Sequence, residues 1–226
     1  YYLKYNKGPH IILNDNDVKK IEKKFEKIHK LNSDNLRIIS FNNRDSAFKR
    51  KILPMLDMSY HNFRNWDFDD YNKTLEYACK KYFVIRSGNV VKKKSNFKNR
   101  NFFEYSNSEF VSPDLDYYII YKSKFFVGSG GGLDKFARLS HIPVMYINDF
   151  HPLYISCWIK KCISLPVKLF DTKKNQYISF KQLADRNYKL SKRNSTPLGL
   201  YHRTKDFEEA NIKIIYNSQD EILSSF

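Results

Sequence analysis

Short apolar segments alternate with segments of helical character along most of the chain. Apolar runs of strand length occur at residues 36–41, 82–85, 102–105, 125–127, 143–147 and 212–215. Helices are predicted over residues 17–31, 67–81, 112–121, 133–140 and 179–184, and from residue 219 onward. Such alternation requires a mostly parallel sheet with helices on both faces. We therefore predict an α/β, Rossmann-like fold of five or more strands, in which 36–41, 83–86, 125–128 and 143–147 are neighbours.

The chain divides into a short lead-in and one larger domain. Residues 1–35 contain an irregular start, the helix at 17–31 and a polar break, and we expect the Rossmann-like domain to span residues 36–226. Residues 150–170 are ambiguous and aromatic, and are predicted to be partly helical. Residue 1 is Tyr rather than Met, so we expect the sequence to be a fragment of a longer chain.

Composition excludes several classes of protein. With 42% hydrophobic and 16% aromatic residues, the chain is too apolar for a disordered tail. Its apolar runs are far shorter than the ~20 residues that span a bilayer. Three cysteines without CxxC spacing argue against a disulfide framework and a zinc site, so a reducing compartment, the cytoplasm, is expected.

The net charge of +16 is compatible with binding to nucleic acid, to an anionic membrane surface or to phosphate-bearing ligands. The alternative is a general richness in Lys, Asn, Ile, Tyr and Phe, as A+T-rich coding produces. Residues 80–100 exceed this background, because they contain eight basic residues and no acidic one. This stretch is a candidate for contact with membrane headgroups or a phosphate.

A glycine-rich loop joins the strand at 125–127 to the helix at 133–140, and it contains Ser129, Gly130, Gly131 and Gly132. Glycines let a backbone approach a ligand closely, and free amides at a helix start attract anions. The loop matches neither the dinucleotide fingerprint nor a P-loop. A tight structural turn would also explain it.

Two arginines follow predicted strands at the same edge of the sheet as this loop. Arg44, followed by Asp45, comes after the first strand, and Arg86 ends the second. The planar guanidinium can grip a diphosphate through paired hydrogen bonds. For either arginine alone, a solvated or salt-bridging side chain is the alternative.

Residues 60–65 form a polar and aromatic loop that contains His61 and Arg64. Two aspartate groups, at 67/69/70 and at 114/116, mimic the D-x-D metal pattern. Both fall at predicted helix starts, where Asp caps the helix, so no metal is expected.

Four motifs occur in order along the chain: RDSA (44–47), SYHNFRN (59–65), YFVIRSG (82–88) and the segment 125–134. Their order and spacing resemble a bacterial glycosyltransferase family found in cell-surface polysaccharide loci. The family patterns are RDSAY, SYHxYRxSD, YVIRMG and FxISTGTGxD. Gly131 replaces a hydroxyl residue of the family loop, and Ser87 replaces a Met. The resemblance covers roughly residues 36–226.

The resemblance implies a metal-independent enzyme of the GT-B type, of which this chain would be the C-terminal half that binds a nucleoside-diphosphate sugar. Arg44 and Arg86 would then hold the diphosphate, with Arg64 as a third cation, and 129–132 would donate hydrogen bonds. Asp134 would orient the loop or bind a ribose hydroxyl. His61 and Asp45 are the candidates for a general base. Positive groups would stabilise the departing diphosphate.

The acceptor implied by the family is a cell-surface glycan or a lipid-linked sugar. The expected location is then the cytoplasm, with the surface of the inner membrane as a second possibility. No cofactor is expected besides the donor substrate. Two alternatives remain open, a non-catalytic nucleotide-sugar-binding domain and a basic nucleic-acid-binding module, although no nucleic-acid-binding motif occurs.

Overall fold

The computed structural model describes residues 8–29, 36–150, 161–184 and 204–226. Its strands are β1 (Ile38–Asn42), β2 (Phe83–Arg86), β3 (Phe102–Glu104), β4 (Phe126–Gly128), β5 (Val144–Asp149), β6 (Cys162–Pro166), β7 (Lys168–Asp171), β8 (Gln176–Tyr177) and β9 (Ile212–Ile215). Its α-helices are α2 (Asp15–His29), α3 (Ala47–Ile52), α4 (Asn72–Cys79), α5 (Pro113–Lys122), α6 (Leu133–Leu139), α7 (Phe180–Ala184), α8 (Thr204–Glu209) and α9 (Gln219–Leu223). Two 3-10 helices, η2 (Ser59–Arg64) and η3 (Phe68–Tyr71), precede α4.

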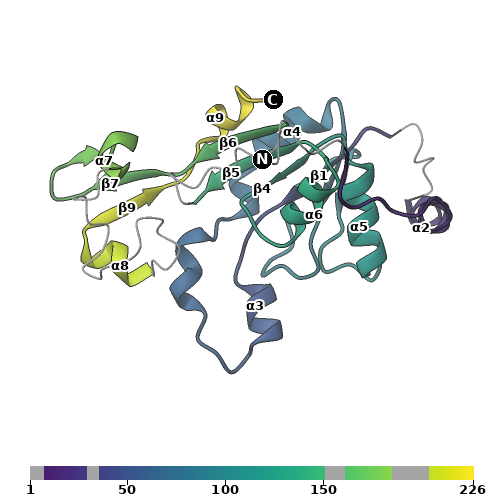
Figure 1. Ribbon diagram of the computed structural model, residues 1–226, viewed down its shortest axis with the longest axis horizontal. Helices are drawn as coiled ribbons and strands as arrows, with labels where there is room; N and C mark the ends of the chain where they lie inside the picture. Colours follow the sequence, from purple (N-terminus) through teal and green to yellow (C-terminus); the bar gives the residue numbers. More distant parts are fainter. Residues whose placement is uncertain (1–7, 30–35, 151–160, 185–203) are drawn as a thin grey trace.

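Within the described residues, β1 to β6 form a six-stranded parallel sheet in the order β3-β2-β1-β4-β5-β6 (Figure 1). The predicted neighbours β2, β1, β4 and β5 are adjacent, so the predicted α/β, Rossmann-like sheet is confirmed. This order is the Rossmann order, in which the chain reverses direction across the sheet between β1 and β4. The carboxyl ends of both strands therefore face one ligand-binding edge.

Helices cover both faces of this sheet because successive strand residues point to opposite sides. Ile39, Val84 and Val127 pack on one face, against residues of α4 and α9. Their neighbours Ile38 and Ile85 pack on the other face, against α5, on which α2 lies. The sheet is thus buried on both sides, as parallel sheets are.

A second, three-stranded antiparallel sheet, β8-β7-β9, lies at one end of the molecule (Figure 1). Its core contains Val167, Leu169, Ile178 and Ile212. One expectation is corrected here. Residues 150–170 were expected to be partly helical, but β6 and β7 occupy 162–166 and 168–171, while 151–160 lie outside the described residues. The predicted strand at 212–215 is present as β9 and belongs to the small sheet.

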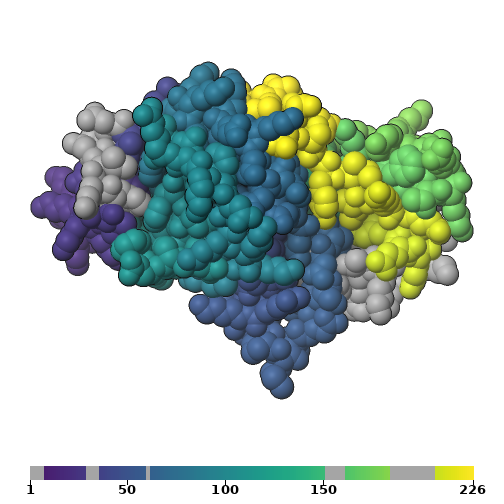
Figure 2. Space-filling view, turned by 180° about the vertical axis from the view of Figure 1, so that it is seen from behind, coloured from purple at the N-terminus to yellow at the C-terminus, as the bar shows by residue number. Residues whose placement is uncertain are grey.

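The long polar segment after β1 contains α3, which the sequence did not predict. Residues 47–58, α3 and the turn after it, project from the body of the molecule, as both views show (Figures 1 and 2). Over the described ranges, no helix has the length and apolar character needed to cross a bilayer.

Candidate functional site

A cavity of about 710 Å³ opens at the carboxyl edge of the parallel sheet. Residues that follow β1, β2 and β4 line it, together with the end of β5, the start of α5 and Arg64 of η2. This is the edge at which α/β sheets bind ligands. Of the residues predicted for the site, Arg44, Asp45, Arg64, Asp134 and the glycines 130–132 line the cavity.

Three cations, Arg44, Lys49 and Arg64, share the cavity wall. No carboxylate of the described residues forms an ion pair with any of them, and the Nε atoms of both arginines are buried without a hydrogen-bond partner there. Burial, followed by repulsion from Arg64, lowers the pKa of Arg44 to about 10. Burial and repulsion from both arginines also lower the pKa of Lys49. The three groups destabilise one another unless an anion lies between them.

Arg64 connects this cluster to the glycine loop. Burial lowers its pKa, whereas the nearby carboxylates of Asp149 and Asp134 raise it. A Cβ atom added to Gly130 would lie 3.6 Å from Nη2 of Arg64. Added to Gly131 or Gly132, it would meet no atom within 4 Å. Arg64 thus adjoins the loop at Gly130, whereas the space beside Gly131 and Gly132 is open.

Asp134 holds the glycine loop in shape. One of its carboxylate oxygens accepts the amide of Gly131, and the other accepts the hydroxyl of Tyr146 at 2.6 Å and lies 3.4 Å from Nε of Arg138. The amide of Gly131 is therefore occupied, which corrects the prediction that it faces a phosphate. Ser129 is buried, its hydroxyl has no partner among the described residues, and it does not line the cavity.

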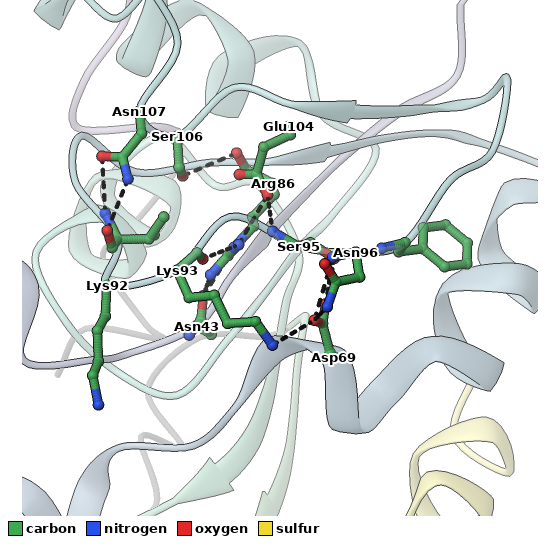
Figure 3. A network of polar contacts seen from close by, with 12 residues as sticks. Asn43, Asp69, Arg86, Lys92, Lys93, Ser95, Asn96, Glu104, Ser106 and Asn107 are labelled. Carbon is green, nitrogen blue, oxygen red and sulfur yellow. Dashed lines mark hydrogen bonds and ion pairs between the residues drawn. The ribbon is translucent and has the colours of Figure 1, made fainter.

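Arg86 lies elsewhere, and the prediction that it lines the diphosphate site is wrong. Its side chain is 2% exposed and stacks on Phe68, 4.3 Å from the ring centroid. Nε and Nη2 donate to Oδ1 of Asn43, and Nη1 donates to Glu104 at 2.9 Å and to the carbonyl of Lys93 (Figure 3). Arg86 thus positions Asn43, which lines the cavity, and the loop after β2.

The two predicted base candidates are weak ones. Asp45 lines the cavity, but its two carboxylate oxygens accept the amides of Ala47 and Lys92. It therefore fixes the start of α3 and the loop after β2. His61 lies in η2, and its side chain is outside the described residues.

Two buried aspartates of the cavity were missed as base candidates. Asp116, considered only as part of a metal pattern, has an Oδ1 atom without a partner in the described region. Burial raises its pKa to about 6, although a hydrogen bond with Tyr105 opposes this. Burial also raises the pKa of Asp149, which accepts the hydroxyl of Ser164 at 3.0 Å. The signals available in the sequence were the position of Asp149 at the end of a predicted strand and that of Asp116 at the start of a predicted helix.

In the described residues, no cluster of three or more His, Cys, Asp or Glu could hold a metal ion, and three aspartates of the two groups have other partners. Asp67 caps η3, Asp69 binds Ser95 and Lys93, and Asp114 pairs with Lys24.

The basic stretch 80–100 does not form one patch. Lys80 and Lys81 precede β2, at the amino edge of the sheet. At the carboxyl edge, the amide of Lys92 donates to Asp45. Figure 3 shows Lys93 paired with Asp69, at 3.2 Å. Of the basic residues in this stretch, Arg86 is buried, whereas those at 92–94 are exposed.

Comparison with solved structures shows similarity to a glycosyl transferase family 9 protein from Veillonella parvula DSM 2008, with a TM-score of 0.50 and 12% sequence identity. The two chains share a fold. The match covers 72% of this chain and 44% of the other, so this chain spans less than half of that protein's length. No family model matches the sequence, and no curated protein matches it.

Proposed function

We propose that this chain is the donor-binding half of a glycosyltransferase that uses a nucleoside-diphosphate sugar. The observation that carries the proposal is the cluster of Arg44, Lys49 and Arg64, three cations without ion-pair partners in the described residues, opposite a glycine loop. A diphosphate would supply the ion-pair partner that none of the described carboxylates provides to these three cations. The motif order and the fold shared with a glycosyl transferase support the same function.

In the proposed reaction, a hydroxyl oxygen of the acceptor forms a bond to the anomeric carbon of the donor sugar. The bond between that carbon and the diphosphate oxygen breaks, and the electron pair leaves with the diphosphate. The role of the three cations is to stabilise this charge as it develops, which is where electrostatic groups contribute most to rate.

The proton of the acceptor hydroxyl needs a base, and Asp116 replaces Asp45 in our proposal. Its pKa of about 6 lies near neutral pH, where proton acceptors are most effective. Its Oδ1 atom is also without a partner among the described residues, whereas both oxygens of Asp45 accept backbone amides.

Calorimetric titration of the chain with a panel of nucleoside diphosphates tests the donor site. Arg44→Ala and Arg64→Ala should each weaken binding about ten- to hundredfold, because hydrogen bonds to charged groups are worth about 1.5–3 kcal/mol. Arg44→Lys should recover only part of the loss, since an ammonium cannot make a paired contact.

The matched control is Arg100→Ala, which removes an exposed arginine before β3. It should leave affinity unchanged. Equal losses of affinity in the three alanine variants would contradict the proposed donor site. Salt-sensitive retention on DNA without nucleotide binding would contradict it as well. Nucleotide binding without sugar transfer by the full-length protein would favour a non-catalytic binding domain.

A further inference from the structure

The projecting segment 47–58, here called the protrusion, exposes an unusual amount of apolar surface. Eleven large apolar side chains are exposed in the described residues, and five of them lie here: Phe48, Ile52, Leu53, Met55 and Leu56. Met55, in the turn after α3, is 93% exposed. Helix α3 contains no buried residue, so packing against the core does not explain these side chains.

Basic side chains accompany this apolar surface. Lys49, Arg50 and Lys51 are consecutive in α3, and no acidic residue occurs from 46 to 56. Apolar side chains beside Lys and Arg are typical of segments that lie in the headgroup layer of an anionic bilayer. The protrusion stands clear of the rest of the molecule, so a flat surface can reach it (Figures 1 and 2).

We propose that the protrusion docks the protein on an anionic lipid surface. The apolar side chains of 52–56 enter the headgroup layer, and Arg50 and Lys51 face the lipid phosphates. The docking segment is thus different from the basic stretch 80–100, whose charges are divided between two edges of the sheet.

The protrusion also adjoins the cavity. Phe48 and Lys49 of α3 line it, and Lys49 also lines a second hollow of about 240 Å³ together with Leu56. Docking would therefore bring the mouth of the cavity close to the membrane. A lipid-linked acceptor could then reach the donor while its lipid stays in the bilayer. Only this last step rests on the proposed function.

Vesicle flotation in about 0.1 M salt tests the docking, with vesicles of phosphatidylcholine alone and vesicles that contain about 30% phosphatidylglycerol. The wild-type chain should float with the acidic vesicles and be released as salt screens the charges. Arg50→Gln/Lys51→Gln should reduce binding about 25-fold, since each cation near the surface contributes about fivefold. Met55→Asp/Leu56→Asp should reduce it at least tenfold.

The matched control is Ile163→Asp/Phe180→Asp, which changes two exposed apolar residues far from the protrusion in sequence and should float like the wild type. Absence of wild-type binding, equal binding to neutral vesicles, or unchanged binding of both protrusion variants would overturn the inference. So would a concentration-dependent dimer that Met55→Asp/Leu56→Asp dissolves, because a second copy would then cover this surface. Nucleoside-diphosphate titration of the same variants separates the two proposals, because docking should fail while nucleotide affinity stays unchanged.

Discussion

At the scale of single residues, Asp116 couples the candidate site to stability. Its pKa is raised from 3.8 to about 6 by burial, so the folded protein holds a proton that the unfolded chain releases between these values. Stability should therefore fall as pH rises from about 4 to about 6, and the loss should remain above pH 6.

Asp116→Asn removes this loss. We expect the variant to be more stable than the wild type by about 1–2 kcal/mol at pH 7 and nearly equal to it at pH 4. Urea unfolding at the two pH values measures the difference. The same variant should bind nucleoside diphosphate normally but lose sugar transfer. A constant stability difference across this pH range would show that Asp116 does not titrate in the site.

The two arginines show how far residue-level prediction from the sequence could go. Arg44 follows β1 and Arg86 ends β2, and the sequence correctly located each at the carboxyl edge. Their roles depend on partners that spacing alone does not reveal. Arg86 donates to Asn43 and forms an ion pair with Glu104. The charge of Arg44, in contrast, is repelled by that of Arg64. Lys49 was missed because no helix was predicted in the polar segment 42–66, which contains α3.

At the scale of elements, the glycine loop between β4 and α6 contains glycines with different requirements. Gly130 has φ of +74°, which non-glycine residues adopt at a cost of roughly 1–2 kcal/mol. Gly132 has φ of −78° and ψ of −44°, and an added Cβ would meet open space. We expect Gly130→Ala to lose about 1 kcal/mol and Gly132→Ala to gain up to about 1 kcal/mol.

Urea unfolding of the two variants checks these opposite signs. Both should weaken nucleoside-diphosphate binding, because each adds a methyl group at the cavity wall. If Gly132→Ala binds as well as the wild type, the loop does not contact the ligand closely.

Elements with buried, continuous apolar runs were predicted within one or two residues. Two elements without such runs, β6 and α3, were not predicted. β6 contains no fully buried residue and ends at Pro166, so it resembled an irregular segment. Helix α3 has no buried face, and helical periodicity therefore could not reveal it.

At the scale of the whole molecule, the lead-in helix belongs to the packed structure. Phe25 of α2 is 1% exposed, and the centroid of its ring lies 5.7 Å from the ring centroid of Tyr118 in α5. We propose that the Rossmann-like domain begins near residue 36 and that α2, although it precedes this boundary, is one of the helices that cover the sheet. The sequence could not show this, because periodicity identifies an apolar face but not the surface that buries it.

Phe25→Ala should therefore cost about 3–5 kcal/mol, as truncation of a buried Phe usually does. Thermal and urea unfolding measure this, with Ile12→Ala, at a 68% exposed position, as the control that should change little. A loss below about 1 kcal/mol would mean that α2 packs only loosely on the domain.

The cluster of Arg44, Lys49 and Arg64 has a practical consequence for handling the protein. Any small multivalent anion that enters the cavity relieves the repulsion between these groups, and binding to the folded state alone raises stability by mass action. Sulfate or phosphate in a purification buffer would thus raise the melting temperature more than chloride at equal ionic strength. The same ions would compete with nucleotide, so a screen in phosphate buffer would underestimate the affinity of the ligand that the cavity is built to hold.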